Sequence, residues 1–356
     1  MYVSSASSGA ITPSREGIMQ GFIDISKFAG MREDLAQAGG GNSSWKETPE
    51  KMYIKASGYQ LADVCEEEGY AIVNPSVIRE AFLNCENLDA MTEEDSKAIL
   101  DKAFIEGKRP SIETFLHSIS GEFTLHTHAT MADVFACRKG GMEELEEMFP
   151  EALFIPYAKP GVELAKVYFK AYKAKGIDAP KVVFMANHGL VVSGDSAEEV
   201  INGTDEIVKK LADKLGIDID SYLNATQLWQ TFKNKVVWRV NDEAVLSTYR
   251  KIGVWDSAFT PDNVCFLGKK FFSISDKIDT KVLDEFLDAY GEPKVIEYKQ
   301  HLYIIADSVR KALEIQSVLS FSATVASINS ENVLLTNAQQ DELLNWDAEK
   351  YRQQFK

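Results

Sequence analysis

Two histidines separated by a single residue, His126 and His128, limit the fold of this chain more than any other pattern in it. They lie in an apolar segment that predicts a β-strand, and alternate residues of a strand point to the same side, so both imidazoles can face one ion. The 356-residue chain has only five histidines, and four of them fall in two short segments, one with His117, His126 and His128 and the other with His188. This concentration predicts a metal site.

His188 completes the predicted site if the end of its strand lies beside the strand of His126 and His128. Zinc and similar divalent ions bind imidazole nitrogens readily, and three protein ligands leave a coordination position open for a substrate. The alternative is that these histidines belong to the core or the surface and form hydrogen bonds with their neighbours. The spaced pair, together with Asn-His-Gly at the end of a predicted strand, favours the metal site.

The charge of the chain excludes several classes of partner. A formal net charge of −16 provides no basic surface for nucleic acid or for an anionic membrane. The first thirty residues lack a leader pattern and no segment predicts a membrane span, so we expect a cytoplasmic protein. The four cysteines lie far apart without a CxxC pair, which argues against a disulfide framework and against a thiolate zinc site.

Periodicity indicates an α/β chain with two domains. A helix is predicted toward residue 35, strands in 51–56 and 64–73, and a helix after Pro110. A further strand is predicted at 181–186 and stops at Asn187-His188-Gly189. The composition changes after about residue 223, where short apolar runs at 264–267 and 301–305 predict strands between helices. We therefore expect a catalytic domain in residues 1–224 and a small C-terminal α/β domain in 225–356, which would cap the site or form an oligomer interface.

A carboxylate precedes the histidine pair. Glu113 lies in the first turn of a predicted helix, with His117 one turn later on the same face. Such a glutamate commonly offsets the helix dipole. A helix-to-strand hairpin would instead bring it beside the metal, where a carboxylate can ligate the ion or move a proton. The sequence leaves these two roles open, and for His117 it favours packing or support of the site over direct ligation.

A glycine-rich segment offers a candidate anion site. Gly39-Gly40-Gly41 is followed by Asn42, two serines and Lys46, and then by Lys55-Ala56-Ser57-Gly58. Glycines let backbone amides approach an anion, and the two lysines would supply positive charge that the acidic chain otherwise lacks. Neither the dinucleotide fingerprint nor the Walker loop is present. Taken alone, the glycines are more typical of a plain turn than of a phosphate cradle.

In this order, the motifs resemble the class II aldolase/adducin family, which includes fuculose- and rhamnulose-1-phosphate aldolases. The resemblance covers roughly residues 15–220 and is strongest to the aldolase part of bifunctional rhamnulose-1-phosphate aldolase/dehydrogenase proteins, with similar segments in the tail, including 260–262 and 346–352. The dehydrogenase part is absent from this sequence. The matching segments are Gly41-Asn42-Ser43-Ser44, Ile54 to Gly58, Arg109 to Thr114 with His117, His126-Thr127-His128, Ile155-Pro156-Tyr157 and Asn187 to Leu190.

The resemblance implies a role for each matching position. His126, His128 and His188 would hold Zn²⁺, or another divalent cation such as Co²⁺ or Mn²⁺. Glu113 would be the catalytic carboxylate, which ligates the metal in the empty site and moves aside for the substrate. Asn42, Ser57, Gly58 and Ser111 would bind the phosphate of a ketose 1-phosphate, and Lys55 is a candidate there because of its positive charge.

Two departures from the family pattern concern the substrate pocket. Ile112 replaces a second hydroxyl before the glutamate, and Lys55 occupies a place often held by threonine, so the phosphate pocket is altered or is suited to another group. No tyrosine follows the histidine pair where fuculose-phosphate aldolase supplies a proton donor across subunits. Tyr157 is our candidate for that role.

The resemblance implies retro-aldol cleavage of a rhamnulose- or fuculose-1-phosphate-like ketose into dihydroxyacetone phosphate and a short aldehyde. The same scaffold would also support a sugar-phosphate 4-epimerase, or a dehydratase or decarboxylase. A non-catalytic, adducin-like binding protein is disfavoured because the three histidines and Glu113 are all present.

The implied fold is a three-layer α/β/α domain with a mainly antiparallel central sheet, plus the small C-terminal α/β unit. The implied assembly is a homo-oligomer, a tetramer in many family members, with sites at subunit interfaces. The expected partner is a small sugar phosphate, with no role for nucleic acid or membrane.

Overall fold

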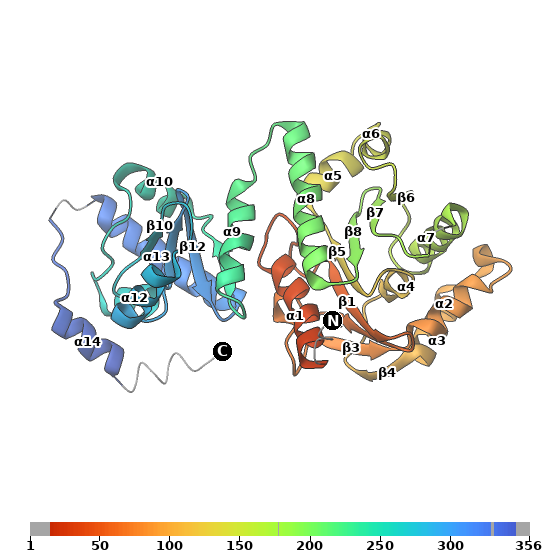
Figure 1. Ribbon diagram of the computed structural model, residues 1–356, viewed down its shortest axis with the longest axis horizontal. Coiled ribbons are helices and arrows are strands. Elements are labelled where there is room, and N and C mark those ends of the chain that lie inside the picture. Colours follow the sequence, from red (N-terminus) through yellow and green to blue (C-terminus); the bar gives the residue numbers. More distant parts are fainter. Residues whose placement is uncertain (1–14, 177, 329–330, 347–356) are drawn as a thin grey trace, which may run out of the picture. The chain divides into compact units, whose positions relative to one another are not determined.

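The computed structural model describes residues 15–176, 178–328 and 331–346, with side chains from residue 19 onward (Figure 1). The described chain forms two compact units. Unit 1 comprises the residues up to Ser26, Gly39–His128 and Ala132–Thr204, and unit 2 comprises Lys27–Ala38, Ala129–Met131 and the chain from Asp205 onward. The proposed domain boundary between residues 224 and 225 falls inside helix α9 (Asp220–Thr231) and stays a proposal.

Unit 1 is built on an eight-stranded sheet. Its neighbouring strands pair antiparallel, apart from the parallel pair of β6 and β7. In spatial order the strands are β4 (Phe104–Gly107), β3 (Tyr70–Val73), β2 (Lys51–Lys55), β1 (Asn42–Thr48), β5 (Phe123–Thr127), β8 (Gly189–Gly194), β7 (Val182–Met185) and β6 (Leu153–Ile155). The histidine pair therefore lies on a central strand, β5.

Helices cover both faces of this sheet. On one face, Ser26 of α1 (Arg15–Gly30) forms a hydrogen bond with Ser43 of β1, and α1 meets α8 (Ala197–Leu215) at Gly21 and Ala197. A buried apolar cluster covers the other face and joins α2 (Pro75–Leu83), α4 (Thr114–Ser118) and α7 (Val162–Lys175) to strands β6 to β8. The predicted three-layer α/β/α domain with a mainly antiparallel sheet is confirmed.

Shorter elements complete unit 1. The helices are α3 (Glu93–Ala103), α5 (Thr130–Ala136) and α6 (Gly141–Met148), with 3₁₀ turns at Leu61–Asp63 and Leu88–Ala90. Helix α4 follows Pro110 and leads into β5, as its sequence predicted. Each functional segment singled out from the sequence thus belongs to unit 1.

Unit 2 is the small C-terminal α/β unit. Its four-stranded sheet has the order β10 (Phe272–Ile274), β11 (Val295–Tyr298), β12 (His301–Ala306) and β9 (Val236–Arg239), with β10 and β11 parallel. Its helices are α9, α10 (Glu243–Ile252), α11 (Pro261–Leu267), α12 (Thr280–Tyr290), α13 (Val309–Ile328) and α14 (Asn337–Asn345). The tail segment that resembles the family at residues 347–352 lies outside the described residues.

One strand prediction in unit 2 is wrong. Residues 264–267 belong to helix α11, which begins with Thr260 as N-cap and Pro261 in the first turn. The Thr260 hydroxyl accepts a hydrogen bond from the Asn263 amide, and the Asn263 side chain accepts one from the Thr260 amide. This capping box starts a helix. The short apolar run within that helix resembles a strand in the sequence. None of the helices in the described parts of the chain is long and apolar enough to cross a membrane.

Candidate metal centre

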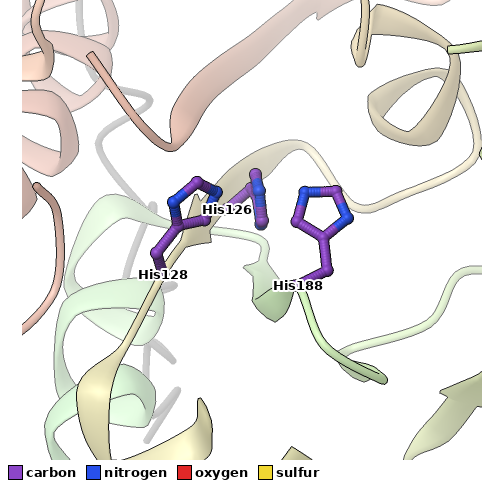
Figure 2. Close-up of side chains that lie close together, drawn as sticks. All are labelled: His126, His128 and His188. Carbon is purple, nitrogen blue, oxygen red and sulfur yellow. The ribbon is translucent and has the colours of Figure 1, made fainter. Parts of the chain in front are cut away.

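The three predicted metal ligands meet at one end of the central strands. His126 lies on β5, His128 directly follows that strand, and His188 lies in the turn between β7 and β8. Because β5 pairs with β8, with His126 opposite Val191, the turn that carries His188 lies beside the histidine pair. Figure 2 shows the three imidazole rings gathered at one place from these two segments.

The turn at His188 explains the Asn-His-Gly sequence. The His188 amide donates a hydrogen bond to the Met185 carbonyl at 3.2 Å, which closes a tight turn. Asn187 has a φ of +53°, a conformation that asparagine adopts more readily than most residues. A Cβ atom at Gly189 would lie 2.3 Å from the Thr127 carbonyl oxygen, so only glycine allows the turn to approach β5 this closely.

The spacing of the three rings fits ligands of one divalent ion. Each histidine offers a ring nitrogen, and these three atoms lie within 4.8 Å of one another. The ring centroids are 5.1 Å apart for His126 and His128, 5.1 Å for His126 and His188, and 5.6 Å for His128 and His188. The three rings thus lie together, as the alternation of His126 and His128 and the neighbouring turn predicted.

The hydrogen bonds of His126 test this interpretation. Its Nδ1 lies 3.1 Å from the Leu190 carbonyl oxygen, so Nδ1–H donates and Nε2 carries the lone pair. That Nε2 atom is buried and has no hydrogen-bond partner among the described residues. Burial also lowers the pKa of His126 to about 4, so the ring is neutral at pH 7, as metal binding requires. The residues present therefore fit a divalent metal.

His128 is partly buried beside His188. Burial lowers its pKa, and His188 lowers it further. The ring is thereby kept in the neutral form that binds a cation.

The carboxylate of Glu113 faces the histidines. Its Oε1 lies 2.9 Å from His188 Nε2 and its Oε2 lies 3.6 Å from His126 Nε2. The Asn42 side-chain amide donates a hydrogen bond to Oε2 at 2.5 Å. Burial would raise the pKa of Glu113, but His126 and His188 outweigh burial and hold this pKa well below its usual range. The carboxylate is therefore ionised at neutral pH.

Glu113 does not act as a helix cap. It is the residue before α4, but its side chain makes no capping hydrogen bond. The Ser111 hydroxyl instead accepts a hydrogen bond from the Glu113 amide at 3.3 Å, and the Ser111 carbonyl accepts one from the Thr114 amide at 3.1 Å. This turn directs the carboxylate to the histidines. The structure places the carboxylate beside the candidate metal ligands, and its catalytic role stays a prediction.

Apart from Asn42 on β1, the candidate phosphate-binding residues lie on two adjacent segments. Ala56 bridges to Pro110, and the Ser57 amide donates a hydrogen bond to the Arg109 carbonyl at 2.9 Å, so Ser57 and Gly58 lie beside Ser111. Ser57 and Gly58 are exposed, whereas Ser111 is buried.

The two lysines that we considered for anion binding lie in different surroundings. Lys55 is buried, and burial lowers its pKa while Glu113 and Asp63 raise it. Lys46 is held elsewhere, because its Nζ donates hydrogen bonds to the Ser120 and Gly121 carbonyls.

Tyr157 lies in the loop after β6 with 65% of its surface exposed. Its catalytic role stays a prediction. His117 is fully buried, and its Nδ1 lies 2.7 Å from the Ser44 hydroxyl, which agrees with a supporting position.

Sequence reasoning missed Asp133 on α5. Burial raises the pKa of Asp133 to about 6 and His188 lowers it, which places this carboxyl in the electrostatic surroundings of the site. An aspartate within an ordinary helical segment gives no sequence signal of this position.

Comparisons with known proteins agree with the geometry. A family model described as the class II aldolase and adducin N-terminal domain matches residues 21–212. Comparison with curated proteins found no match.

Similar solved structures have low sequence identity to this chain. The N-terminal class II aldolase domain of a Thermoplasma acidophilum protein is 23% identical, with 60% of this chain and 100% of that chain covered and a TM-score of 0.49. L-fuculose-1-phosphate aldolase from Thermus thermophilus is 17% identical, with 61% and 98% covered and a TM-score of 0.36. A sugar-phosphate aldolase from Thermotoga maritima is 15% identical, with 60% and 96% covered and a TM-score of 0.38.

Proposed function

Because the chain belongs to the class II aldolase and adducin N-terminal domain family, we propose that it is a zinc-dependent aldolase that cleaves a ketose 1-phosphate. The products would be dihydroxyacetone phosphate and a short aldehyde, from a rhamnulose- or fuculose-1-phosphate-like substrate. One observation carries the proposal: the buried Nε2 of His126 has no hydrogen-bond partner among the described residues and faces the ionised carboxylate of Glu113.

His126, His128 and His188 would hold the metal through one ring nitrogen each. When bound, a divalent cation supplies a Lewis acid that stabilises negative charge on the carbonyl and hydroxyl oxygens of the sugar. The hydrogen bond from His126 Nδ1 to Leu190 fixes this ring and keeps its Nε2 available.

Glu113 would move the proton at carbon 3. Cleavage removes a proton from the 4-hydroxyl, breaks the bond between carbons 3 and 4, and returns a proton to carbon 3, so the overall reaction consumes no acid or base. An ionised carboxylate has no proton of its own, so Glu113 would accept the proton that the 4-hydroxyl loses, relayed through Tyr157, and deliver it to carbon 3. The Asn42 amide, which donates a hydrogen bond to Glu113, would orient it. Tyr157 is our candidate for the group that exchanges the proton of the 4-hydroxyl.

The phosphate would bind beside Glu113, between the two adjacent segments that carry Lys55, Ser57, Gly58 and Ser111. Lys55 supports this assignment because it brings positive charge to a chain whose net charge is −16. Asn42 would contribute from β1.

Product analysis tests the proposal. The purified protein, with Zn²⁺, Co²⁺ or Mn²⁺ added, is incubated with L-rhamnulose 1-phosphate and with L-fuculose 1-phosphate, and dihydroxyacetone phosphate is measured by reduction with NADH. We expect triose phosphate to form and its formation to stop when a chelator removes the metal. Light scattering on the same sample tests the expected homotetramer.

Other outcomes would assign the protein differently. A phosphorylated product with its carbon chain intact and one stereocentre inverted would indicate a 4-epimerase. Loss of water or carbon dioxide would indicate a dehydratase or decarboxylase. A protein that binds no divalent ion and converts no substrate would contradict the proposal and favour an adducin-like binding role.

A further inference from the structure

Three alternate residues of β1 bind the segment that carries Glu113. Asn42, Ser44 and Lys46 point to the same face of the sheet because side chains alternate along a strand. Each contacts a successive part of residues 113–121, which contain α4. We call these three contacts the β1–α4 ladder.

The rungs of the ladder are direct polar contacts. The Asn42 amide donates to Glu113 Oε2 at 2.5 Å, and the Ser44 hydroxyl lies 2.7 Å from His117 Nδ1. Lys46 Nζ donates to the carbonyls of Ser120 at 2.5 Å and Gly121 at 2.9 Å, directly after the helix. Ser44 and His117 are both fully buried, so no solvent replaces their hydrogen bond.

The repeat distances of the two elements match. Residues two apart on a strand are separated by about 6.6 Å, and residues four apart on a helix rise by about 6 Å. Asn42 and Ser44 on the strand therefore meet Glu113 and His117 on the helical segment without a change of register. Loss of the contact between Ser44 and His117 would therefore also shift Glu113 relative to Asn42.

Helix α4 depends on such contacts. It has only five residues, and helices of this length are not stable by themselves. The turn at Ser111 fixes the chain before Glu113, whereas the contacts of His117 and Lys46 fix it afterwards. The orientation of the Glu113 carboxylate is thus set by contacts on both sides.

We propose that Ser44 and His117 are positioning residues, whose hydrogen bond holds the Glu113 carboxylate at the distance from the histidine cluster that the reaction requires. This inference rests on the proposed function, because it concerns the carboxylate of that site. Displacement of a catalytic group by about 1 Å lowers turnover strongly, so a rung that never touches the substrate affects the rate.

Ser44→Ala tests the ladder, and the neighbouring Ser43→Ala is its control. Ser43 is equally buried and loses a similar hydrogen bond, with Ser26 at 2.7 Å, but it lies on the opposite face of β1. Both variants should lower the melting temperature similarly. Only Ser44→Ala should lower kcat, by about tenfold, with KM changed much less.

Bound Co²⁺ provides a readout that does not depend on turnover. We expect Ser44→Ala to alter the visible absorption of Co²⁺ in the substrate-free protein, because Glu113 would contact the ion there, whereas Ser43→Ala should match the unmodified protein. Equal spectra and equal kcat values for the two variants would overturn the inference. If the unmodified protein cleaves no sugar phosphate, the proposed function fails, but the Co²⁺ spectra still decide whether the ladder positions Glu113.

A second pair of variants covers the case in which Ser44→Ala does not fold. His117→Asn keeps a polar atom near the Nδ1 position, and His117→Ala removes it. The ladder predicts that asparagine restores most of the kcat and of the Co²⁺ spectrum that alanine loses. Equal defects in both variants would contradict a positioning role.

Discussion

At the scale of single residues, the two ring nitrogens of His126 have different tasks. In His126, Nδ1 is held by the Leu190 carbonyl and Nε2 faces Glu113 from a buried position. A buried polar atom without a partner is costly, so its retention calls for a ligand that completes it. A divalent cation fits because the neighbouring rings of His128 and His188 offer nitrogen atoms at the same place.

Replacement of Glu113 by glutamine removes the proton carrier but leaves the three imidazoles. We expect Glu113→Gln to retain zinc and to lower kcat by about 100-fold or more, the usual cost of losing a proton-transfer group. Zinc content and steady-state kinetics measure the two effects. Glu106→Gln, at an exposed position on β4, serves as the control. Unchanged kinetics for Glu113→Gln would remove Glu113 from the mechanism.

The positive charge of Lys55 should affect the binding of phosphorylated substrates only. For Lys55→Met we expect the KM of a phosphorylated ketose to rise about tenfold, equivalent to about 1.4 kcal/mol, with little change for the unphosphorylated sugar. Lys51→Met, on the same strand, is the matched control. An equal rise of KM for both substrates would place Lys55 outside the phosphate pocket.

The metal-free protein should lose stability as the pH falls from 6.5 toward 5. Burial lowers the pKa of His126 to about 4 and that of His117 to about 3, from an ordinary value of 6.5. The unfolded chain therefore binds protons in this range that the folded chain does not, and lower pH favours unfolding.

Each of these histidines contributes a slope of up to about 1.4 kcal/mol per pH unit to the free energy of unfolding. Glu113 has a lowered pKa in the folded chain, so its contribution is lost only below its ordinary value of 4.5, outside this range. Asp133 acts in the opposite direction, because burial raises its pKa to about 6 and the folded chain gains a proton there that the unfolded chain does not. This one carboxyl offsets only one of the two histidines, so lower pH still favours unfolding. Urea denaturation at several pH values should give a shallower slope for His117→Asn than for the unmodified protein. Identical slopes would show that His117 is not buried in its neutral form.

At the scale of secondary-structure elements, the close approach of turns to β5 builds the site. Gly41 precedes β1 with a φ of +74°, and a Cβ atom there would lie 2.7 Å from the His126 carbonyl oxygen. Gly189 makes the corresponding approach from the β7–β8 turn. The sequence indicated a turn or a phosphate cradle at Gly39 to Gly41, and the structure adds a steric reason for the last glycine.

A comparison of two glycines in one run tests this packing. Gly41→Ala should lower the free energy of unfolding by about 1–3 kcal/mol and reduce zinc binding, because the new methyl group displaces His126. Gly39→Ala meets open space and should change neither quantity. Urea denaturation and metal titration measure both. Equal stability of the two variants would contradict the steric account.

Elements with strong local signals could be predicted from the sequence. The β5 strand, the helix that follows Pro110 and the turn at Asn187 after β7 all appear where periodicity and turn residues indicated them. Helix α11 could not be predicted from its apolar run, because the capping box of Thr260 and Asn263 decided its conformation. The β1–α4 ladder joins residues 71 and 73 positions apart, and contacts this distant leave no periodic pattern.

At the scale of the whole molecule, the two units of the described chain differ in how much of each the family model covers and in whether they carry site residues. The family model covers residues 21–212, so all of the chain that follows α8 lies beyond it. Each residue that we assign to metal, proton transfer or phosphate belongs to unit 1. The three-layer arrangement could be predicted because the motifs, in their order, resemble a family with that fold. The interleaved division of the chain, with Lys27–Ala38 in unit 2, had no signal in the sequence.

The central claim is that three imidazoles from two segments hold one divalent cation beside Glu113. A crystal grown with Zn²⁺, with anomalous scattering recorded at the zinc absorption edge, tests it most directly. The account predicts one strong peak within bonding distance of ring nitrogens of His126, His128 and His188. A crystal without such a peak, or with zinc bound only elsewhere, would contradict it.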